Sequence, residues 1–176
     1  DDDTLHGDTL SYSASGLPAW LSLDAATGVL SGTPDNGDVG SYTITVTATD
    51  EDGETASSEF VLTVDNVNDV PVVTNAVEEL AGTVTEAGAA DDGTAVAGTA
   101  TVSGTLAASD VDTGATQTWS IQGTPSTTYG SIAIDVATGV WTYTLDNTKT
   151  ATQALKEGEF VTQTYTARVT DEFGAY

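Results

Sequence analysis

Residues 42–49 read YTITVTAT, and this stretch decides the fold class of the chain. Apolar side chains at every second position, from Tyr42 through Ile44 and Val46 to Ala48, alternate with threonines. A period of two places the two sets on opposite faces of a β-strand, one buried and one wet. Residues 60–64 repeat the alternation as FVLTV. The pattern predicts strands of a β-sandwich.

Short strand patterns between turn residues continue along the chain. We expect further strands at residues 10–12, 20–23, 29–30, 102–107, 116–122, 131–135, 140–145 and 160–170. A helical turn near residues 152–156 is too short to form a lone helix. The 176 residues with 18 glycines therefore fit two all-β domains of ordinary size.

The same motifs occur in the same order in both halves. Residues 23–30, LDAATGVL, are echoed by residues 134–141, IDVATGVW, and each predicts a hairpin around an Asp-x-Ala-Thr-Gly turn. Residues 42–53 are echoed by residues 165–174. Such repetition indicates two related modules. A short acidic linker from Asp65 to Pro71 joins domains 1–70 and 71–176.

The charge of the chain is strongly one-sided. It has 27 acidic residues and 3 basic ones, a formal net charge of -24. Nucleic acid and anionic membrane are therefore excluded as partners. Cysteine is absent, so no disulfide can rigidify the protein, and no apolar run is long enough for membrane insertion. Without a methionine or a signal peptide, we expect an interior piece of a longer protein.

The acidic residues gather at the predicted loops and in the linker. Loops with Asp-x-Asp spacing offer Ca²⁺ the oxygen ligands it prefers. We expect one calcium site from Asp1, Asp3 and Asp8. At the joint and in the second module we expect ligands among Asp50, Asp52, Asp65, Asn66, Asn68, Asp69, Glu86, Asp110, Asp112 and Asp171. The alternative is an acidic surface that only keeps the protein soluble, and the repeated spacing favours cation sites.

Two stretches resemble known families. Residues 8–70, with GLPAWL at 16–21 and DAATG at 24–28, resemble a dystroglycan-type cadherin-like module. Residues 78–176, with SDVD at 109–112 and DVATGVW at 135–141, resemble the VCBS repeat. The linker DNVNDVP resembles the junction between cadherin-like repeats. Modules of both kinds are strung together in large bacterial RTX-type surface adhesins.

The resemblance implies an all-β fold of two tandem Ig-like or cadherin-like β-sandwich modules joined by a short acidic linker. Relative to the families, domain 1–70 lacks its first strand and domain 71–176 lacks its last strand. The missing strands are expected from flanking sequence or from another copy of the chain. Strand donation between copies would build a fibre.

The sequence gives little support to catalysis. His6 is the only histidine, and neither a zinc site nor a Gly-x-Ser-x-Gly nucleophile motif can be assembled. A glycosidase pair among so many acids is explained better by calcium ligation. We therefore expect no enzyme and no catalytic residue. Asp24 and Asp135 are expected to cap turns rather than to bind metal.

The aromatic residues leave a second function open. Trp20, Trp119 and Trp141, with Tyr12, Tyr42 and Tyr143, are expected in the core or as a platform for sugar rings. Core packing is favoured for Trp20 and Trp119, while the face of Trp141 is not decided. An exposed aromatic strip would indicate a carbohydrate-binding module of a secreted polysaccharide-active protein.

Taken with these patterns, the resemblance implies a calcium-rigidified structural and adhesive repeat segment of a long extracellular bacterial surface protein, acting in adhesion, biofilms or filaments. The carbohydrate-binding module is the alternative. The expected cofactor is Ca²⁺. Expected partners are neighbouring repeat modules, other copies by strand donation and surface glycans.

Overall fold

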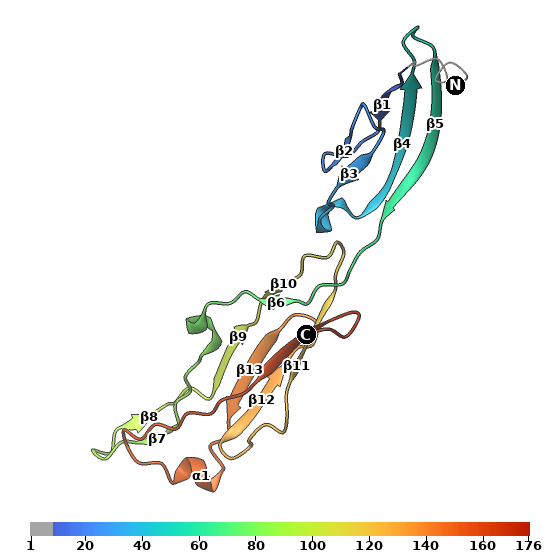
Figure 1. Cartoon of the computed structure of the whole chain (residues 1–176). Helices are drawn as coiled ribbons and strands as arrows, with labels where there is room; N and C mark the ends of the chain where they lie inside the picture. The colour runs from blue at the N-terminus through green and yellow to red at the C-terminus, as the bar shows by residue number, and fades with distance from the viewer. Residues whose placement is uncertain (1–8) are drawn as a thin grey trace. The chain divides into compact units, whose positions relative to one another are not determined.

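Strands make up almost all of the regular structure in residues 9–176, which are the residues that this computed structural model describes (Figure 1). The chain divides into two units, Asp1–Val67 and Asn68–Tyr176. The all-β fold class is confirmed. This division falls slightly before the expected boundary after residue 70, because Asn68 and Asp69 already form hydrogen bonds within the second unit.

Unit 1 is built from two antiparallel sheets, with strand orders β1-β4-β5 and β2-β3. Its elements are β1 (Ser11–Ser15), β2 (Leu21–Leu23), β3 (Leu30–Gly32), η2 (Asn36–Asp38), β4 (Gly40–Thr49) and β5 (Thr55–Val64). Ile44 is fully buried, as the alternation predicts, and Leu21 is 9% exposed. Trp20 packs edge to face on Tyr42 at 5.9 Å between ring centroids.

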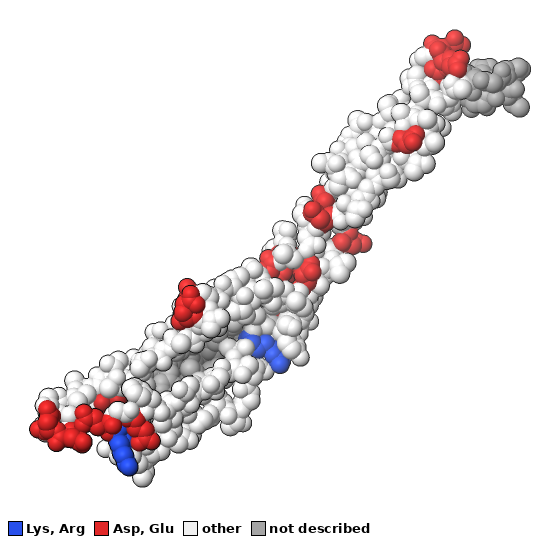
Figure 2. All heavy atoms as spheres, turned by 60° about the vertical axis from the view of Figure 1, so that its left-hand side comes forward, with Lys and Arg blue, Asp and Glu red and all other residues white. Residues whose placement is uncertain are grey.

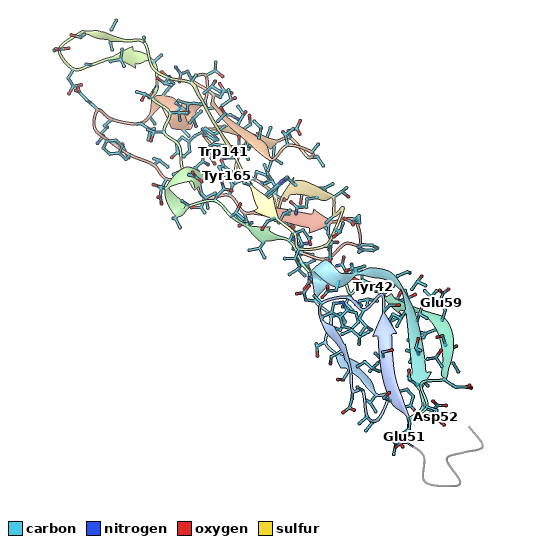
Figure 3. All side chains as sticks on the ribbon, turned by 90° about the horizontal axis from the view of Figure 1, so that it is seen from above. Tyr42, Glu51, Asp52, Glu59, Trp141 and Tyr165 are labelled. Carbon is cyan, nitrogen blue, oxygen red and sulfur yellow. The ribbon has the colours of Figure 1, made fainter. Side chains whose placement is uncertain are left out.

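The β4–β5 hairpin runs the length of unit 1. Its register pairs Thr49 with Thr55 at one end and Gly40 with Val64 at the other. Figure 3 shows Glu51 and Asp52 at the tip of this hairpin. β5 lies at the edge of its sheet, and Glu59 is its one charged residue. It begins earlier than the expected residue 60, because β4 offers a partner along its whole length.

Unit 2 has a three-stranded sheet of order β12-β13-β9 and three two-stranded sheets, β11-β14, β10-β6 and β7-β8. Its elements are β6 (Val72–Val73), η3 (Val77–Leu80), β7 (Gly88–Ala89), β8 (Ala95–Val96), β9 (Thr101–Thr105), β10 (Ala108–Ser109), β11 (Gln117–Ile121), β12 (Gly130–Ile134), β13 (Val140–Leu145), α1 (Thr150–Gln153) and β14 (Ala167–Asp171). Trp119 and Val169 are buried, each 5% exposed.

The repeated turns are structurally equivalent. The Asp24 carboxylate accepts hydrogen bonds from the amides of Ala26 and Thr27, and Asp135 does the same for the two residues that follow Val136. These bonds hold the pKa of each aspartate below its usual range, with the amides and hydroxyls of the turn threonines as the main cause. The prediction that both residues cap turns is confirmed.

One predicted strand is largely absent. Residues 160–170 were expected to be extended in a ladder, but only Ala167–Asp171 form β14. The partner strand β11 spans only residues 117–121, and the amide of Gln122 donates to the carbonyl of Thr166 just beyond it, so no strand of the described chain pairs with residues 160–165. The expected helical turn at 152–156 lies slightly earlier, as α1.

Gly139 tests how tightly the second turn packs. Its φ is +69°, and a Cβ there would lie 2.6 Å from the carbonyl oxygen of Leu106 and 2.9 Å from Nε1 of Trp119. Gly123 has φ +72° and nothing within 4 Å of its Cβ position. We expect Gly123→Ala to destabilise unit 2 by about 1 kcal/mol and Gly139→Ala by about 2 kcal/mol more.

Denaturant unfolding followed by tryptophan fluorescence would measure the difference in free energy. Equal losses in the two variants would show that the turn does not pack closely against Trp119.

Candidate metal centre

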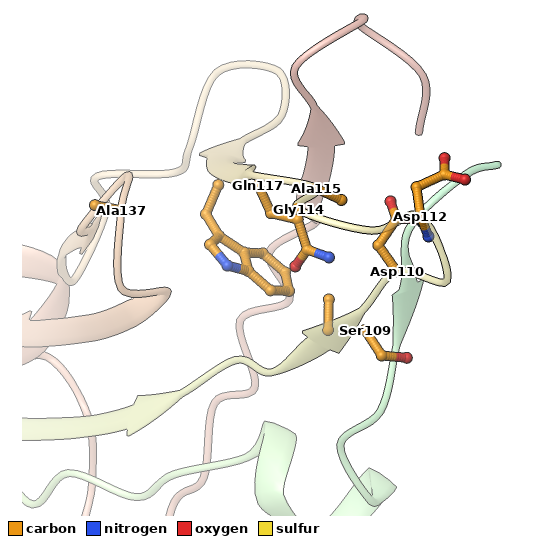
Figure 4. Close-up of a pocket in the computed structure, with 9 residues that line it drawn as sticks. Ser109, Asp110, Asp112, Gly114, Ala115, Gln117 and Ala137 are labelled. Carbon is orange, nitrogen blue, oxygen red and sulfur yellow. Dashed lines mark hydrogen bonds between the residues drawn. The ribbon is translucent and has the colours of Figure 1, made fainter. Parts of the chain in front are cut away.

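The loop between β10 and β11 presents two carboxylates. The amide of Asp112 donates to Oδ1 of Asp110 at 3.0 Å, and the amide of Ala115 donates to the carbonyl of Asp112 at 3.2 Å. The short Asp-x-Asp spacing thus folds into a tight turn. Asp112 is only 9% exposed. Figure 4 shows both carboxylates at one end of a pocket of about 430 Å³, which Ser109 and Gln117 also line.

Asp171 ends β14, opposite Gln117 of β11. Its Oδ1 accepts from the amides of Phe173 at 2.9 Å and Ala175 at 2.8 Å, and the residue is 6% exposed. The side-chain amide of Asn68 is the main cause that holds the pKa of Asp171 below its usual range. Backbone amides of the turn add to the effect, and desolvation opposes it.

The chain entering unit 2 is held by these acids. Nδ2 of Asn68 donates to Oδ2 of Asp171 at 2.8 Å, and the amide of Asp69 donates to Oδ2 of Asp112 at 2.8 Å. Asn68, Asp69, Asp112 and Asp171 therefore meet although up to 103 positions separate them along the chain. Asp110 joins them through its bond to Asp112.

Two carboxylate oxygens of this cluster have no hydrogen-bond partner. Oδ2 of Asp110 and Oδ1 of Asp112 are buried, and neither accepts a hydrogen bond from the described residues. A buried, unpaired carboxylate oxygen is costly unless a cation or a donor meets it. The donor set of carboxylate and amide oxygens is the one that Ca²⁺ prefers.

The carboxylates of this cluster do not converge on a single position for a metal ion. Within residues 9–176, no three Asp, Glu, His or Cys side chains lie close enough together to hold one metal ion. Instead, Oδ2 of Asp171 accepts a hydrogen bond from Asn68, and Oδ2 of Asp112 accepts one from the amide of Asp69. Metal binding would therefore require these groups to reorient.

The other predicted ligands do not join this cluster. Asp50 and Asp52 were expected to share a site with Asp65, and the hairpin register corrects this. The turn at Asp50 is at one end of β5, and Asp65 follows the other end, about 30 Å away for a ten-residue strand. Asn66, like Asp65, is an exposed residue of unit 1.

Glu86 is also separate. Its Oε1 accepts a hydrogen bond from Gln153 of α1, at the end of unit 2 where β7 and β8 lie (Figure 1). The predicted ligands Asp1, Asp3 and Asp8 lie outside the described residues, as does His6.

The turn at Asp50 shares several hydrogen bonds with the turn at Asp171. Oδ1 of Asp50 accepts from the amide of Glu54, and Oδ1 of Asp171 accepts from the amide of Ala175. In both turns, a glycine three residues after the aspartate donates to the aspartate carbonyl. Asp50 is therefore the counterpart of Asp171 in unit 1.

The tryptophans do not form an exposed strip in the described chain. Trp119 is buried, as predicted, while Trp20 and Trp141 are only partly exposed. Trp141 and Tyr165 both belong to unit 2, and each is partly buried (Figure 3). Of the other pocket residues, Ser109 was quoted from the sequence only as part of the SDVD motif, and Gln117 was not singled out, although it lies within a few positions of Asp112.

One family model matches the first part of the chain. Residues 1–65 match the family model described as "Putative Ig domain". This match agrees with the Ig-like sandwich expected for the first module. A comparison with curated proteins found no match.

Solved structures similar to the chain include cadherin-type ectodomains. The protocadherin γB4 extracellular domain is 21% identical, with a TM-score of 0.49, and the match covers 94% of this chain and 24% of that one. Protocadherin γB2 extracellular cadherin domains 3–6 are 18% identical, with a TM-score of 0.46, covering 94% of this chain and 40% of that one. The human desmocollin-1 ectodomain is 16% identical, with a TM-score of 0.38, covering 96% of this chain and 28% of that one. The chain thus spans less than half the length of each.

Among the described residues, no helix has the length and apolar character needed to cross a membrane.

Removing the Asn68 amide should raise the pKa of Asp171. With a folded pKa below the ordinary 3.8, Asp171 contributes stability that is present above that value and is lost as the pH falls through the folded pKa. In Asn68→Ala the folded pKa should lie closer to 3.8, so this loss should be smaller and should be complete at a higher pH. Carboxyl carbon chemical shifts, followed by NMR against pH, would measure the pKa of Asp171 in the unchanged protein and in the variant.

Asp135 serves as the internal control, because Asn68 does not bond to it and its pKa should stay unchanged. An unshifted Asp171 in Asn68→Ala would contradict the assigned cause.

Proposed function

We propose that this chain is a calcium-rigidified structural and adhesive repeat segment of a long extracellular bacterial surface protein. The observation that carries the proposal is the pair of buried, partnerless oxygens on Asp110 and Asp112, beside the bonds that Asn68 and Asp69 make as the chain enters unit 2. A divalent cation would supply the missing partner for both oxygens.

The carboxylates of Asp110, Asp112 and Asp171 would provide the charge of this site. Asn68 now donates through Nδ2, and a rotation of its amide by half a turn would present its oxygen instead. Asp69 adds a further carboxylate from the entering chain. Ca²⁺ takes about six to eight oxygens, so these five residues with water or carbonyl groups suffice.

The ion would fix the linker to unit 2. Asn68 and Asp69 belong to the linker expected from the sequence, whereas Asp112 and Asp171 belong to the sandwich. Ligands from both parts on one ion would remove the freedom of the chain just before β6. Bound calcium would also offset repulsion among acids that only 3 basic residues counter in the whole chain.

A second calcium site is proposed at the start of unit 1. Asp50 is the counterpart of Asp171, so it would act with Asp52 and with Asp1, Asp3 and Asp8 of the preceding segment. Asp65, Asn66 and Glu86 remain proposed calcium ligands.

Adhesion and an extracellular location are supported by the Ig-type match of unit 1 and by the resemblance of unit 2 to VCBS repeats. We propose neighbouring modules of the same protein as the main partners, in a surface protein of the adhesin, biofilm or filament type. No catalytic activity is proposed. The described residues have no exposed tryptophan strip, which is the feature that the carbohydrate-binding alternative predicts.

Calcium should stabilise unit 2, and Asp112→Asn should abolish the effect. At a calcium concentration about one hundred times the Kd, binding adds about 2.7 kcal/mol. For a unit of this size, that corresponds to a rise of Tm on the order of 10 °C. Calorimetry in EGTA and in millimolar calcium would measure Tm.

Asp135→Asn is the matched control, since that aspartate only caps a turn. It should keep the full calcium response. An Asp112→Asn variant that responds like the unchanged protein would remove this site from the proposal, and the absence of any response would remove calcium altogether.

A further inference from the structure

A long groove opens along unit 2, away from the acidic cluster at the chain entry. It has a volume of about 1510 Å³, and the inner face of the β12-β13-β9 sheet forms its floor. Its walls are residues 80–91 on one side and residues 158–167 on the other. Figure 2 shows the surface of unit 2 hollowed along this face. Sites for small molecules are typically about 300–1,000 Å³, so the groove suits a longer, chain-like occupant.

The floor of the groove is an apolar sheet face without a complete cover. Ile132, Ile134, Trp141 and Leu145 line it, and each is only partly buried. In a two-layer sandwich such a face packs against a second sheet. The β11-β14 pair supplies only part of that second layer. The floor therefore offers packing surface for the apolar side chains of one more strand.

One wall offers backbone groups as well. In the described structure, the amides and carbonyls of residues 160–165 form no hydrogen bond. The sequence there, FVTQTY, is rich in β-branched and aromatic residues, and β14 follows it directly. Phe160 is 91% exposed. A free edge of this kind is a template for an added strand.

The rim of the groove is acidic at one end. Glu86, Asp91, Glu157 and Glu159 line it there, and Lys156 is the one basic residue among the lining side chains. Figure 2 shows these charges gathered at the end of unit 2. An occupant with lysine or arginine at that end would be attracted to this rim.

We propose that unit 2 binds an extended basic polypeptide segment, which adds as a β-strand along residues 160–165 and packs its alternating apolar side chains on the groove floor. The apolar floor and the unpaired backbone together match a peptide, because a peptide strand supplies apolar side chains and backbone donors and acceptors at one spacing. A second copy of the chain fits less well, since each copy carries a net charge of -24.

Fluorescence anisotropy with the full chain tests this binding. The probe is a labelled peptide of about ten residues in which valine and threonine alternate, with two lysines at one end. We expect it to bind, a version with glutamates in place of the lysines to bind at least about tenfold more weakly, and a version with two prolines inside the strand not to bind. Hydrogen exchange should show new protection of the amides of residues 160–165.

Val161→Pro and Thr162→Pro remove amides that bond to nothing in the described chain. Since alternate amides point to the same edge, one of the two variants should bind the peptide at least about tenfold more weakly. Val77→Pro is the matched control. Val77 is the first residue of η3, 82% exposed, and the preceding Ala76 is already extended, so proline fits there.

The proposal does not rest on calcium, so the binding is measured in EGTA as well as in calcium and should be the same. It would be overturned by equal binding of the proline-broken peptide, by no effect of either proline variant, or by no binding at millimolar concentration. Self-association through the groove in sedimentation, or displacement of the peptide by an oligosaccharide or a fatty acid, would assign the groove to another occupant and overturn it too.

Discussion

Two hydrogen bonds fix where the second sandwich begins. Asn68 and Asp69 reach the carboxylates of Asp171 and Asp112, which stand at the end of β14 and just before β11. These two strands pair with each other and carry the buried Trp119 and Val169. The entry of the chain, one sheet of the sandwich and its best-buried side chains are thus tied to the same few acidic residues.

Acidic residues have two different physical roles in unit 2. At the chain entry, Asp112 and Asp171 are buried and accept hydrogen bonds from backbone amides. For Asp171, these amides and the Asn68 side chain favour the ionised form. At the far end they line the rim of an apolar groove and face solvent beside a single lysine. A protein without cysteine that carries this much charge depends on such placement, since neither disulfides nor abundant surface ion pairs hold it together.

The sequence predicted what local patterns can specify. The alternation around Ile44 gave a buried strand position, and the Asp-x-Ala-Thr-Gly turns formed at Asp24 and Asp135. The grouping of the acids was less predictable, because it depends on which end of a hairpin each loop occupies. Asp50 and Asp65 were expected at one site because both lie in acidic segments, but the ten-residue strand β5 separates them.

Strand pairing set the other limit. Residues 160–166 have the composition of a strand, yet a ladder needs a neighbour and β11 ends too early to supply one. Conversely, the two-residue strands β6 and β10 form but were not predicted, since two residues are too few to show a period. Both errors arise because the strand propensity of a segment depends on its own residues, whereas its pairing depends on which other strands of the sandwich lie beside it.

The edge strand β5 has a consequence for how the protein is kept soluble. Ten residues, TASSEFVLTV, contain no proline and no glycine, and Phe60 and Val61 are 40% and 62% exposed. Segments of this composition at an open edge are the ones that nucleate cross-β aggregation. Glu59, in the middle of the strand, is the only gatekeeper charge (Figure 3). Where many copies are crowded together, the charge of Glu59 is the feature of β5 that opposes edge-to-edge pairing of these strands into an amyloid-like array.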